Sequence, residues 1–357
     1  MSSWVKISAL VLLVCFVALW VLPHLPYTEA TEQPHYKGII DVWHVETFEG
    51  GNGSRANWLK ARAQELEKKY SGLYFQITTL SYRQLTEKLS EGQTFDIISF
   101  SGGTGNAVLP YLVPYNGVLE CYDNLQRSGE AEGVTYAVAY SAGMYALFAR
   151  NKHLEMNSLQ QETLSDNLFN CGVTLKQGKN TIVLDSMGVG FAAFNSPLSA
   201  LSYKGIRGGA KYSDSVTQYS AYESYLTGKK FVALLGTQRD VNRLNARLEQ
   251  SRTDPFVTVV LDSYTDLVQY LALGTSDAVK QSYCRMFIEH ITSAESQKKL
   301  SYIGMLSVHG QCDHSDETLD IMENSLQHCV VPSVFESFEA ITQRRNEAQQ
   351  FVEGVAE

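Results

Sequence analysis

Segments with the character of strands and helices alternate from residue 38, and this alternation restricts the fold more than any other feature of the sequence. Three short, apolar segments predict strands: residues 38–43, 73–80 and 95–100. Between the first two, apolar residues recur at the spacing of a helix that buries one face: Leu59, Ala63, Leu66 and Tyr70. Ser81, with Gln84 three residues later, predicts the capped start of a second helix. This order predicts an α/β fold with a parallel sheet and helices on its faces.

A long, mostly apolar run at residues 135–150 predicts a strand that crosses from this unit into a second α/β unit. Three strands are expected there: residues 181–185, 230–236 and 255–261. A helix is expected after residue 240, and three more follow in the C-terminal part: residues 263–273, 277–293 and 333–352. A chain of 357 residues is long enough for two domains with separate cores.

The N-terminus carries an uncharged apolar segment, residues 7–22, directly after Lys6. This pattern is typical of an export signal, and it is slightly shorter than the roughly 20 residues that usually span a bilayer. Residues 1–30 are therefore either a cleaved signal peptide or a tilted, uncleaved membrane anchor. Both interpretations place the remaining chain outside the cytoplasm. A lipid anchor on Cys15 would need a small residue before it, and Val14 stands there.

The charge of the chain excludes one class of partner. The formal net charge is −9, and no basic cluster opposes it, so a nucleic-acid partner is not expected.

Cysteines and histidines gather near the C-terminus. The exported part holds five cysteines: Cys121, Cys171, Cys284, Cys312 and Cys329. Because five is an odd number, at least one thiol is free or pairs with another chain. The last two cysteines lie close in sequence to three histidines: His309, His314 and His328. Their spacing fits no zinc finger, so a Cys312–Cys329 disulfide is favoured over a metal site.

A glycine-rich loop follows the first strand, in the stretch HVETFEGGNGSRANW of residues 44–58. Gly51, Gly53 and Ala56 match the loose form of a dinucleotide-binding motif, but six residues separate the strand from the first of these glycines. No acidic residue ends the second strand either, so no nucleotide cofactor is predicted. The loop instead indicates the wall of a ligand crevice, and its side chains suit a sugar: Trp43, His44, Glu46 and Phe48. Trp43 can equally be a core residue.

Several segments, taken in order, resemble those of a known family. They are IIDVWH, QELEKKYSGLYFQITTLSYRQLTEKL, EGQTFDIISF, TYAVAYSAGMYALFARN, LLGTQRD, SYTDLVQYLAL and CRMFIEHITSAESQKKLSYIGMLSV. Their order and spacing, over residues 38–310, resemble the extracellular solute-binding proteins of family 1, the maltose-binding-like proteins of carbohydrate ABC transporters. The chain differs from many relatives in lacking a lipid-attachment motif. It also keeps only Trp43 and Trp58 after the signal, so tyrosines would have to stack on a sugar.

The resemblance implies a two-lobe, periplasmic-binding-protein-like fold, in which crossing hinge segments let the lobes close on a ligand. One lobe would comprise residues 35–138 and 262–305, and the other residues 139–261 and 306–357. Matching positions place the ligand-binding residues at strand ends and on the crossing strand. They are Trp43, His44, Glu46, Phe100, Ser101, Gly102, Tyr140, Gln238, Arg239, Asp240, Tyr264 and Asp266. Arg239 offers a fork of donors to hydroxyls or a carboxylate, or pairs with a carboxylate of the protein itself.

The sequence therefore predicts a non-catalytic binding protein, without cofactor or metal, that delivers a sugar or oligosaccharide to an ABC transporter permease. A membrane-tethered sensor that signals to a membrane kinase and a binder of a non-sugar solute are the alternatives. An enzyme is not expected, because the stretch AYSAG at residues 139–143 lacks the first glycine and the turn of a nucleophile elbow.

Overall fold

The computed structural model describes a large part of the chain. The described residues are Phe16, Tyr222, Leu226 and the ranges 36–118, 120–150, 160–161, 173–177, 180–182, 233–250, 256–261, 264–310, 312–314, 316–337 and 339–343. None of the helices in these ranges is long and apolar enough to cross a membrane. Apart from Phe16, the apolar segment at residues 7–22 lies outside the described residues, so the signal or anchor stays a prediction.

The first sheet has five strands in the order β2-β1-β3-β13-β6. Its strands are β1 (Gly38–Val45), β2 (Leu73–Leu80), β3 (Ile97–Ser101), β6 (Ala137–Ala142) and β13 (Val268–Leu273). β1 pairs in parallel with both β2 and β3, whereas β13 runs antiparallel to β3 and β6. The predicted alternation of strands and helices with a parallel sheet is thus confirmed for the N-terminal unit.

Helices cover both faces of this sheet. They are α2 (Arg55–Lys69), α3 (Tyr82–Ser90) and α9 (Ala278–Thr292). The predicted capping box at Ser81 and Gln84 opens α3. Because successive strand residues point to opposite faces, the neighbours Trp43 and His44 face different layers. The ring of Trp43 packs on Phe95 and lies 5.4 Å from Lys88 Nζ of α3, whereas His44 faces the α2 side.

The helix predicted at residues 263–273 is wrong, because residues 268–273 form β13. All six residues of this strand are buried, since it lies between β3 and β6 and both of its faces are covered. A strand buried on two faces loses the alternation of apolar and polar residues, so its sequence resembles a buried helix segment.

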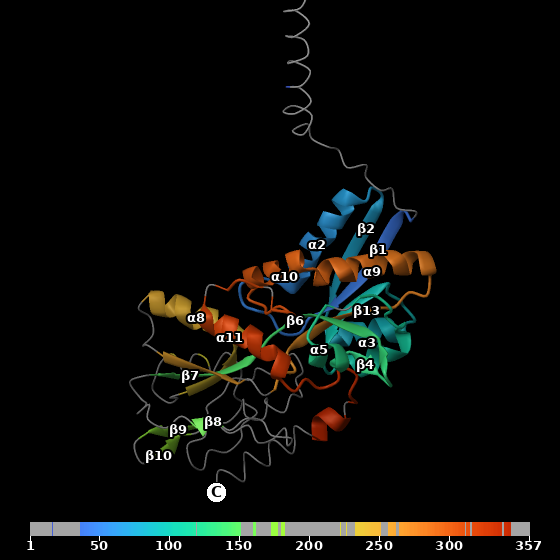
Figure 1. Cartoon of the computed structure of the whole chain (residues 1–357). Coiled ribbons are helices and arrows are strands. Elements are labelled where there is room, and N and C mark those ends of the chain that lie inside the picture. Colours follow the sequence, from blue (N-terminus) through green and yellow to red (C-terminus); the bar gives the residue numbers. More distant parts are fainter. Residues whose placement is uncertain are drawn as a thin grey trace, which may run out of the picture.

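The second sheet has three strands in the order β11-β7-β12, and both outer strands run antiparallel to the central one. These strands are β7 (Tyr145–Arg150), β11 (Ala233–Thr237) and β12 (Phe256–Leu261). α8 (Gln238–Glu249) follows β11 directly, and α11 (Glu317–Ser325) contacts both α8 and β12. Figure 1 shows α8 and α11 near β7, apart from the strands β1 and β2 of the first sheet.

Shorter elements complete the described residues. They are α4 (Gly105–Val108), η3 (Leu109–Tyr111), α5 (Asp123–Ser128), β4 (Glu130–Ala131), β5 (Val134–Thr135), β8 (Gln160–Gln161), β9 (Val173–Gln177), β10 (Asn180–Ile182), α10 (Ala294–Lys298), η6 (Lys299–Ile303) and η7 (Leu326–His328). Of the strand predicted at residues 181–185, the last three residues lie outside the described residues. The helix predicted at residues 333–352 is wrong at its start, because residues 333–337 are turn and irregular structure; residues 339–343 are helical, and residues beyond 343 lie outside the described residues.

Three segments pass side by side between the parts of the chain that carry the two sheets. The first two join strands of different sheets, and the third leads from η6 toward α11. In the first, Gly143 and Met144 join β6 to β7, which confirms the predicted crossing strand. In the second, residues 264–267 lead into β13, and Gly143 N donates to Leu267 O at 2.6 Å. In the third, Leu306 exchanges two backbone hydrogen bonds with Ala142, at 2.9 and 3.0 Å. The division of the whole chain into lobes at the predicted boundaries stays a prediction.

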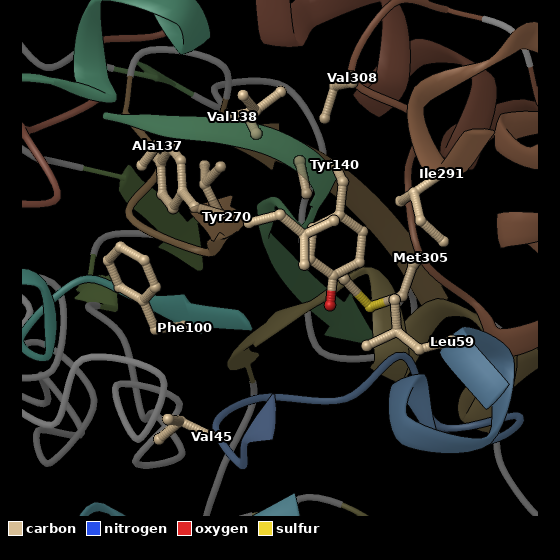
Figure 2. Close-up of a cluster of buried hydrophobic side chains, with 14 of the residues drawn as sticks. Val45, Leu59, Phe100, Ala137, Val138, Tyr140, Tyr270, Ile291, Met305 and Val308 are labelled. Carbon is tan, nitrogen blue, oxygen red and sulfur yellow. The ribbon is translucent and has the colours of Figure 1, made fainter. Parts of the chain in front are cut away.

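Apolar side chains from several elements meet beside these segments (Figure 2). Tyr140 of β6, Leu59 of α2, Ile291 of α9 and Met305 of the third segment are all fully buried in one core. Full burial of side chains of this size contributes roughly 1.5–3 kcal/mol each. The core therefore anchors the ends of the crossing segments in the first sheet.

The favoured disulfide is wrong, because Cys312 and Cys329 form no disulfide, and neither do Cys121 and Cys284. The two thiols of the expected pair contact different carbonyls: Cys312 Sγ lies 3.1 Å from Gln297 O, and Cys329 Sγ lies 3.6 Å from Ser325 O. Cys171 lies outside the described residues.

Gly50 lies where the glycine-rich loop meets the turn after η6, and its substitution by alanine tests this close approach. An added Cβ would lie 2.1 Å from Ile303 O and 2.4 Å from Gly304 C, both backbone atoms that cannot rotate away. We expect Gly50→Ala to lower the free energy of unfolding by about 3 kcal/mol or more, measured by urea denaturation.

Gly92→Ala is the control for this substitution. A Cβ at Gly92 meets nothing within 4 Å, although the residue has a φ of +75°. The control should lose only about 1–2 kcal/mol from backbone strain. Equal losses in the two variants would show that Gly50 is not sterically restricted.

Candidate functional site

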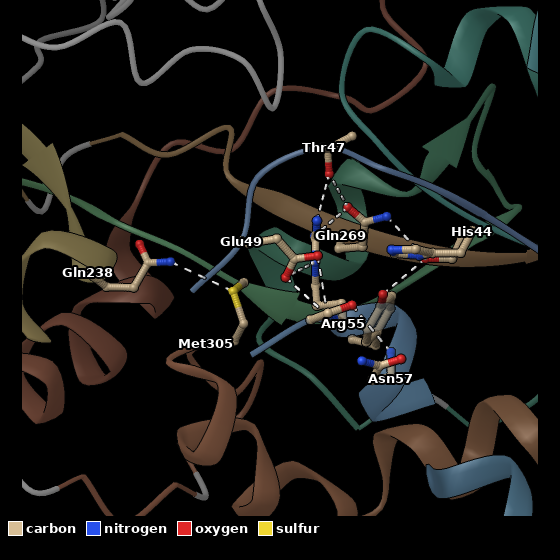
Figure 3. A network of polar contacts seen from close by, with 11 residues as sticks. His44, Thr47, Glu49, Arg55, Asn57, Gln238, Gln269 and Met305 are labelled. Carbon is tan, nitrogen blue, oxygen red and sulfur yellow. Dashed lines mark hydrogen bonds and ion pairs between the residues drawn. The ribbon is translucent and has the colours of Figure 1, made fainter. Parts of the chain in front are cut away.

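A buried arginine ties the glycine-rich loop to the first sheet (Figure 3). Arg55 opens α2 and is fully buried. Its Nη1 donates to Gln269 Oε1 of β13 at 2.7 Å, and its Nη2 donates to Thr47 Oγ1 at 2.9 Å. Thr47 Oγ1 itself donates to the same Gln269 oxygen at 2.8 Å. Because the donors of a guanidinium form a rigid fork, these bonds fix the loop against β13 in one orientation.

Glu49 supplies the counter-charge for this arginine. Its Oε2 lies 3.5 Å from Arg55 Nε, and its two oxygens accept the Arg55 backbone N–H at 3.1 and 3.3 Å. The guanidinium also lies over the ring of Phe48, 4.5 Å from the ring centre. Burial raises the pKa of Glu49, and the positive charge of Arg55 opposes that rise. The carboxylate of Glu49 thus balances the charge of the buried guanidinium inside the loop.

His44 extends the network into the sheet. Its Nδ1 lies 2.9 Å from Ser99 Oγ, which also contacts Tyr140 OH at 3.0 Å and accepts Gln269 Nε2 at 3.1 Å. Burial, followed by the charge of Arg55, lowers the pKa of His44 to about 3. The ring is therefore neutral near pH 7. Its Nε2 is buried and has no hydrogen-bond partner within the part of the chain that the structure describes.

Gln238, the first residue of α8, joins two of the crossing segments. Its Oε1 accepts Met144 N at 3.1 Å, and its Nε2 lies 3.8 Å from Met305 Sδ. Its backbone N–H donates to Met144 O at 3.0 Å. The predicted ligand residue Gln238 is fully buried and holds the crossing segments together.

Asp240, in the first turn of α8, completes the cap at the N-terminus of this helix. Its Oδ2 accepts Thr237 N at 3.1 Å, and its Oδ1 accepts Arg243 Nη1 at 3.1 Å. Burial raises the pKa of this fully buried carboxyl, and Arg243 opposes the rise. Asp240 therefore has a structural pairing with Arg243 rather than with its neighbour Arg239.

Arg239 lies where α8 meets the glycine-rich loop. A Cβ added to Gly51, which has a φ of +95°, would lie 2.8 Å from Arg239 Cγ. Glycine at this position thus permits both the backbone conformation and the close approach of α8. Arg239 is half-buried, and its buried Nε has no hydrogen-bond partner among the residues described.

Tyr264 and Asp266 meet at the second crossing segment. Tyr145 OH donates to Asp266 Oδ1 at 2.7 Å, and Tyr264 OH donates to Asp266 Oδ2 at 3.3 Å. All three residues are buried, so the carboxylate links β7 to this segment.

The remaining predicted residues divide between core and surface. Trp43 and Phe100 are 6% and 0% exposed and pack on other aromatic rings. Ser101 is also buried, whereas Gly102 is half-buried and Glu46 is exposed. The structure thus connects His44 with Tyr140 through Ser99, and Tyr264 with Asp266, but it separates Trp43 and Phe100 from these groups. Ligand contact by any of them stays a prediction.

Sequence reasoning missed Arg55, Ser99 and Gln269, which connect the network. Ser99 and Gln269 are polar residues inside the apolar strands IISFS and VQYLAL. A polar residue that interrupts a buried strand needs a partner, so this interruption was a usable signal. Arg55 gave no such signal, because a charged residue in the first turn of a helix is usually exposed.

No protein-family model matches the chain, and no curated protein sequence matches it. Solved structures do. The sugar-binding protein MalE from Xanthomonas citri has a TM-score of 0.62 and 12% identity, over 89% of this chain and 93% of that one. The GacH receptor of Streptomyces glaucescens, solved unliganded and with acarbose, has a TM-score of 0.56 and 13% identity, over 89% of this chain and 94% of that one. An extracellular solute-binding protein from Staphylococcus aureus, solved with maltose, has a TM-score of 0.55 and 12% identity, over 90% of this chain and 98% of that one.

At these identities the similarity establishes the fold. The chain has the mixed α/β fold of the sugar-binding, maltose-binding-like proteins, as the resemblance of its segments implied.

Replacing Arg55 by methionine tests the buried network. The variant keeps most of the side-chain volume but leaves Gln269 Oε1 and Glu49 without the guanidinium. Removing one partner of a buried charge network costs about 3–5 kcal/mol, so we expect a loss of this size in the free energy of unfolding.

Arg83→Met is the matched control, because Arg83 forms an exposed pair with Glu87 and is itself 88% exposed. We expect a change below about 1 kcal/mol there. A similar small change for Arg55→Met would contradict the structural role of the network.

The neutral state of His44 predicts a dependence of stability on pH. The pKa of His44 is about 3 in the folded protein and about 6.5 in the unfolded chain. At a pH between these two values, only the unfolded chain binds the proton. Stability therefore falls as the pH falls, by about 2 kcal/mol from about pH 8 to about pH 5. His44→Asn, measured by urea denaturation across this range, should remove that part of the slope. An unchanged slope in the variant would assign the pH dependence to other groups.

Proposed function

We propose that the protein is a non-catalytic solute-binding protein that captures a sugar or oligosaccharide outside the cytoplasm. The observation that carries this proposal is the fold, with two sheets joined by three adjacent crossing segments. Proteins described as binding maltose or acarbose share this fold over 89–90% of the present chain.

The ligand would be held between loops of the two sheets. We assign direct contact to three predicted residues that are exposed or half-buried: Glu46, Gly102 and Arg239. His44, whose Nε2 is buried, would support them from behind. Glu46 offers a carboxylate acceptor, and Arg239 offers forked donors, which together suit neighbouring sugar hydroxyls. The other predicted residues would support this surface from behind: Trp43, Phe100, Ser101, Tyr140, Gln238, Asp240, Tyr264 and Asp266.

Closure of the two lobes would occur by rotation about the crossing segments. The three crossing segments lie next to one another: Gly143–Met144, residues 264–267 and Met305–Leu306. A small change of their backbone angles would therefore move α8 relative to the glycine-rich loop. The ligand selects the closed state because only that state lets both loops bind it.

The closed complex would then deliver its ligand to the permease of an ABC transporter. The apolar N-terminal segment supports export, with the protein either released or tethered to the membrane. A tethered sensor that signals to a membrane kinase would use the same ligand-driven closure.

The described titratable groups support binding rather than catalysis. His44 has a pKa of about 3 and is a poor base near neutral pH, and Asp240 is occupied as a helix cap.

A thermal unfolding screen of the exported part against mono- and oligosaccharides, amino acids, polyamines and phosphate esters tests this function. A ligand at about 100 times its dissociation constant adds about 2.7 kcal/mol to stability. We expect one class of sugar to raise the midpoint, with no product formed. Arg239→Met should lower the affinity for that ligand at least about tenfold, because hydrogen bonds to charged groups contribute about 1.5–3 kcal/mol.

Arg83→Met, on the exposed face of α3, should leave the affinity unchanged. A flat response to every sugar would remove the carbohydrate assignment, and a response to another solute class would replace it. Turnover of the bound sugar would overturn the non-catalytic assignment.

A further inference from the structure

We propose that Cys312, His314 and Glu323 form a binding site for a zinc ion, separate from the ligand site. Their ligand atoms, one thiol sulfur, one imidazole nitrogen and one carboxylate oxygen, all lie within 4.8 Å of one another. Cys312 and His314 belong to the segment that leaves the third crossing, and Glu323 belongs to α11. Residues from two elements thus present three different zinc-binding atoms to one point.

The geometry needs only small adjustments to hold the ion. At Zn–N and Zn–O distances of about 2.0–2.2 Å and a Zn–S distance of about 2.3 Å, tetrahedral ligand atoms lie roughly 3.3–3.6 Å apart. His314 Nε2 and Glu323 Oε2 are 2.9 Å apart and joined by a hydrogen bond, so the ion would replace this bond and separate the two atoms slightly. Cys312 Sγ, which now contacts Gln297 O at 3.1 Å, would turn toward them.

The surroundings favour a divalent ion of intermediate softness. The side chains of His314 and Glu323 are only 2% and 4% exposed, whereas Cys312 is half-buried and leaves a path to the ion. On binding, the thiol releases its proton to solvent, and the thiolate and carboxylate together balance the two positive charges. Calcium and magnesium prefer oxygen ligands throughout, so a sulfur, a nitrogen and an oxygen select zinc or a similar metal.

Backbone groups hold the carboxylate in place. Ser307 N and Cys312 N donate to Glu323 at 2.7 and 2.9 Å, and such outer bonds fix the orientation of a metal ligand. These donors belong to the segment that follows the crossing at Leu306. The ion would therefore join the third crossing segment to α11 and stabilise the contact between them.

The test uses the intact protein, freed of metal with a chelator and then titrated with Zn²⁺ by calorimetry and with Co²⁺ by absorbance. We expect one equivalent per chain at this site, a higher unfolding temperature with Zn²⁺, and a thiolate-to-cobalt charge-transfer band. Cys312→Ser should remove that band and lower the Zn²⁺ affinity by at least about 100-fold, since loss of outer contacts alone costs roughly 10–100-fold.

Cys329→Ser is the control, because Cys329 is a buried cysteine without a disulfide bond that lies outside this cluster. It should keep both the band and the affinity. If Cys312→Ser does not fold without metal, His314→Gln carries the same test through the Zn²⁺ affinity. Wild-type protein without a thiolate band, or equal Zn²⁺ affinity in wild type and folded variant, would overturn the proposal. This result would not affect the sugar-binding function, which uses other residues.

Discussion

The side-by-side passage of three chain segments between the two sheets is the constraint on which the rest of the structure depends. Ala142 and Leu306 exchange backbone hydrogen bonds there, and Thr265 Oγ1 donates to Gly143 O at 2.7 Å. These bonds satisfy buried backbone groups that would otherwise be costly away from water. Because all three segments meet, the rotation proposed for lobe closure would bend them together at one place.

The buried network of Arg55 keeps the glycine-rich loop rigid beside this place. A buried guanidinium needs its charge balanced: Glu49 supplies the counter-charge, and Gln269 and Thr47 accept from Nη1 and Nη2, whereas Nε lies 3.5 Å from Glu49 without a hydrogen bond. The loop therefore lies beside Arg239 of α8 in one fixed conformation. If the loop binds ligand as proposed, its preordering would lower the entropy cost of binding.

Local rules predicted the elements whose signals lie in neighbouring residues. The Ser81 capping box, the alternating β2 and the one-sided helix α2 were read correctly because one face of each is buried and the other meets water. β13 was read wrongly because both of its faces are buried, and the Cys312–Cys329 disulfide failed because proximity in sequence does not bring two thiols together. The roles of Trp43 and Phe100 followed from packing against partners distant in sequence, such as Phe95 and Phe335.

The sequence by itself determined the alternation of strands and helices, a crossing strand within residues 135–150 and the resemblance to a two-lobe binding fold. The tertiary structure alone decided which polar residues meet. Ser99 and Gln269 lie 170 positions apart in sequence, and Arg55 and Gln269 lie 214 apart. The tertiary structure also brings Glu323 of α11 next to His314 and Cys312, because the chain folds back between the loop and the helix. Periodicity reports which face of an element is buried, whereas the identity of the partner depends on how the elements pack.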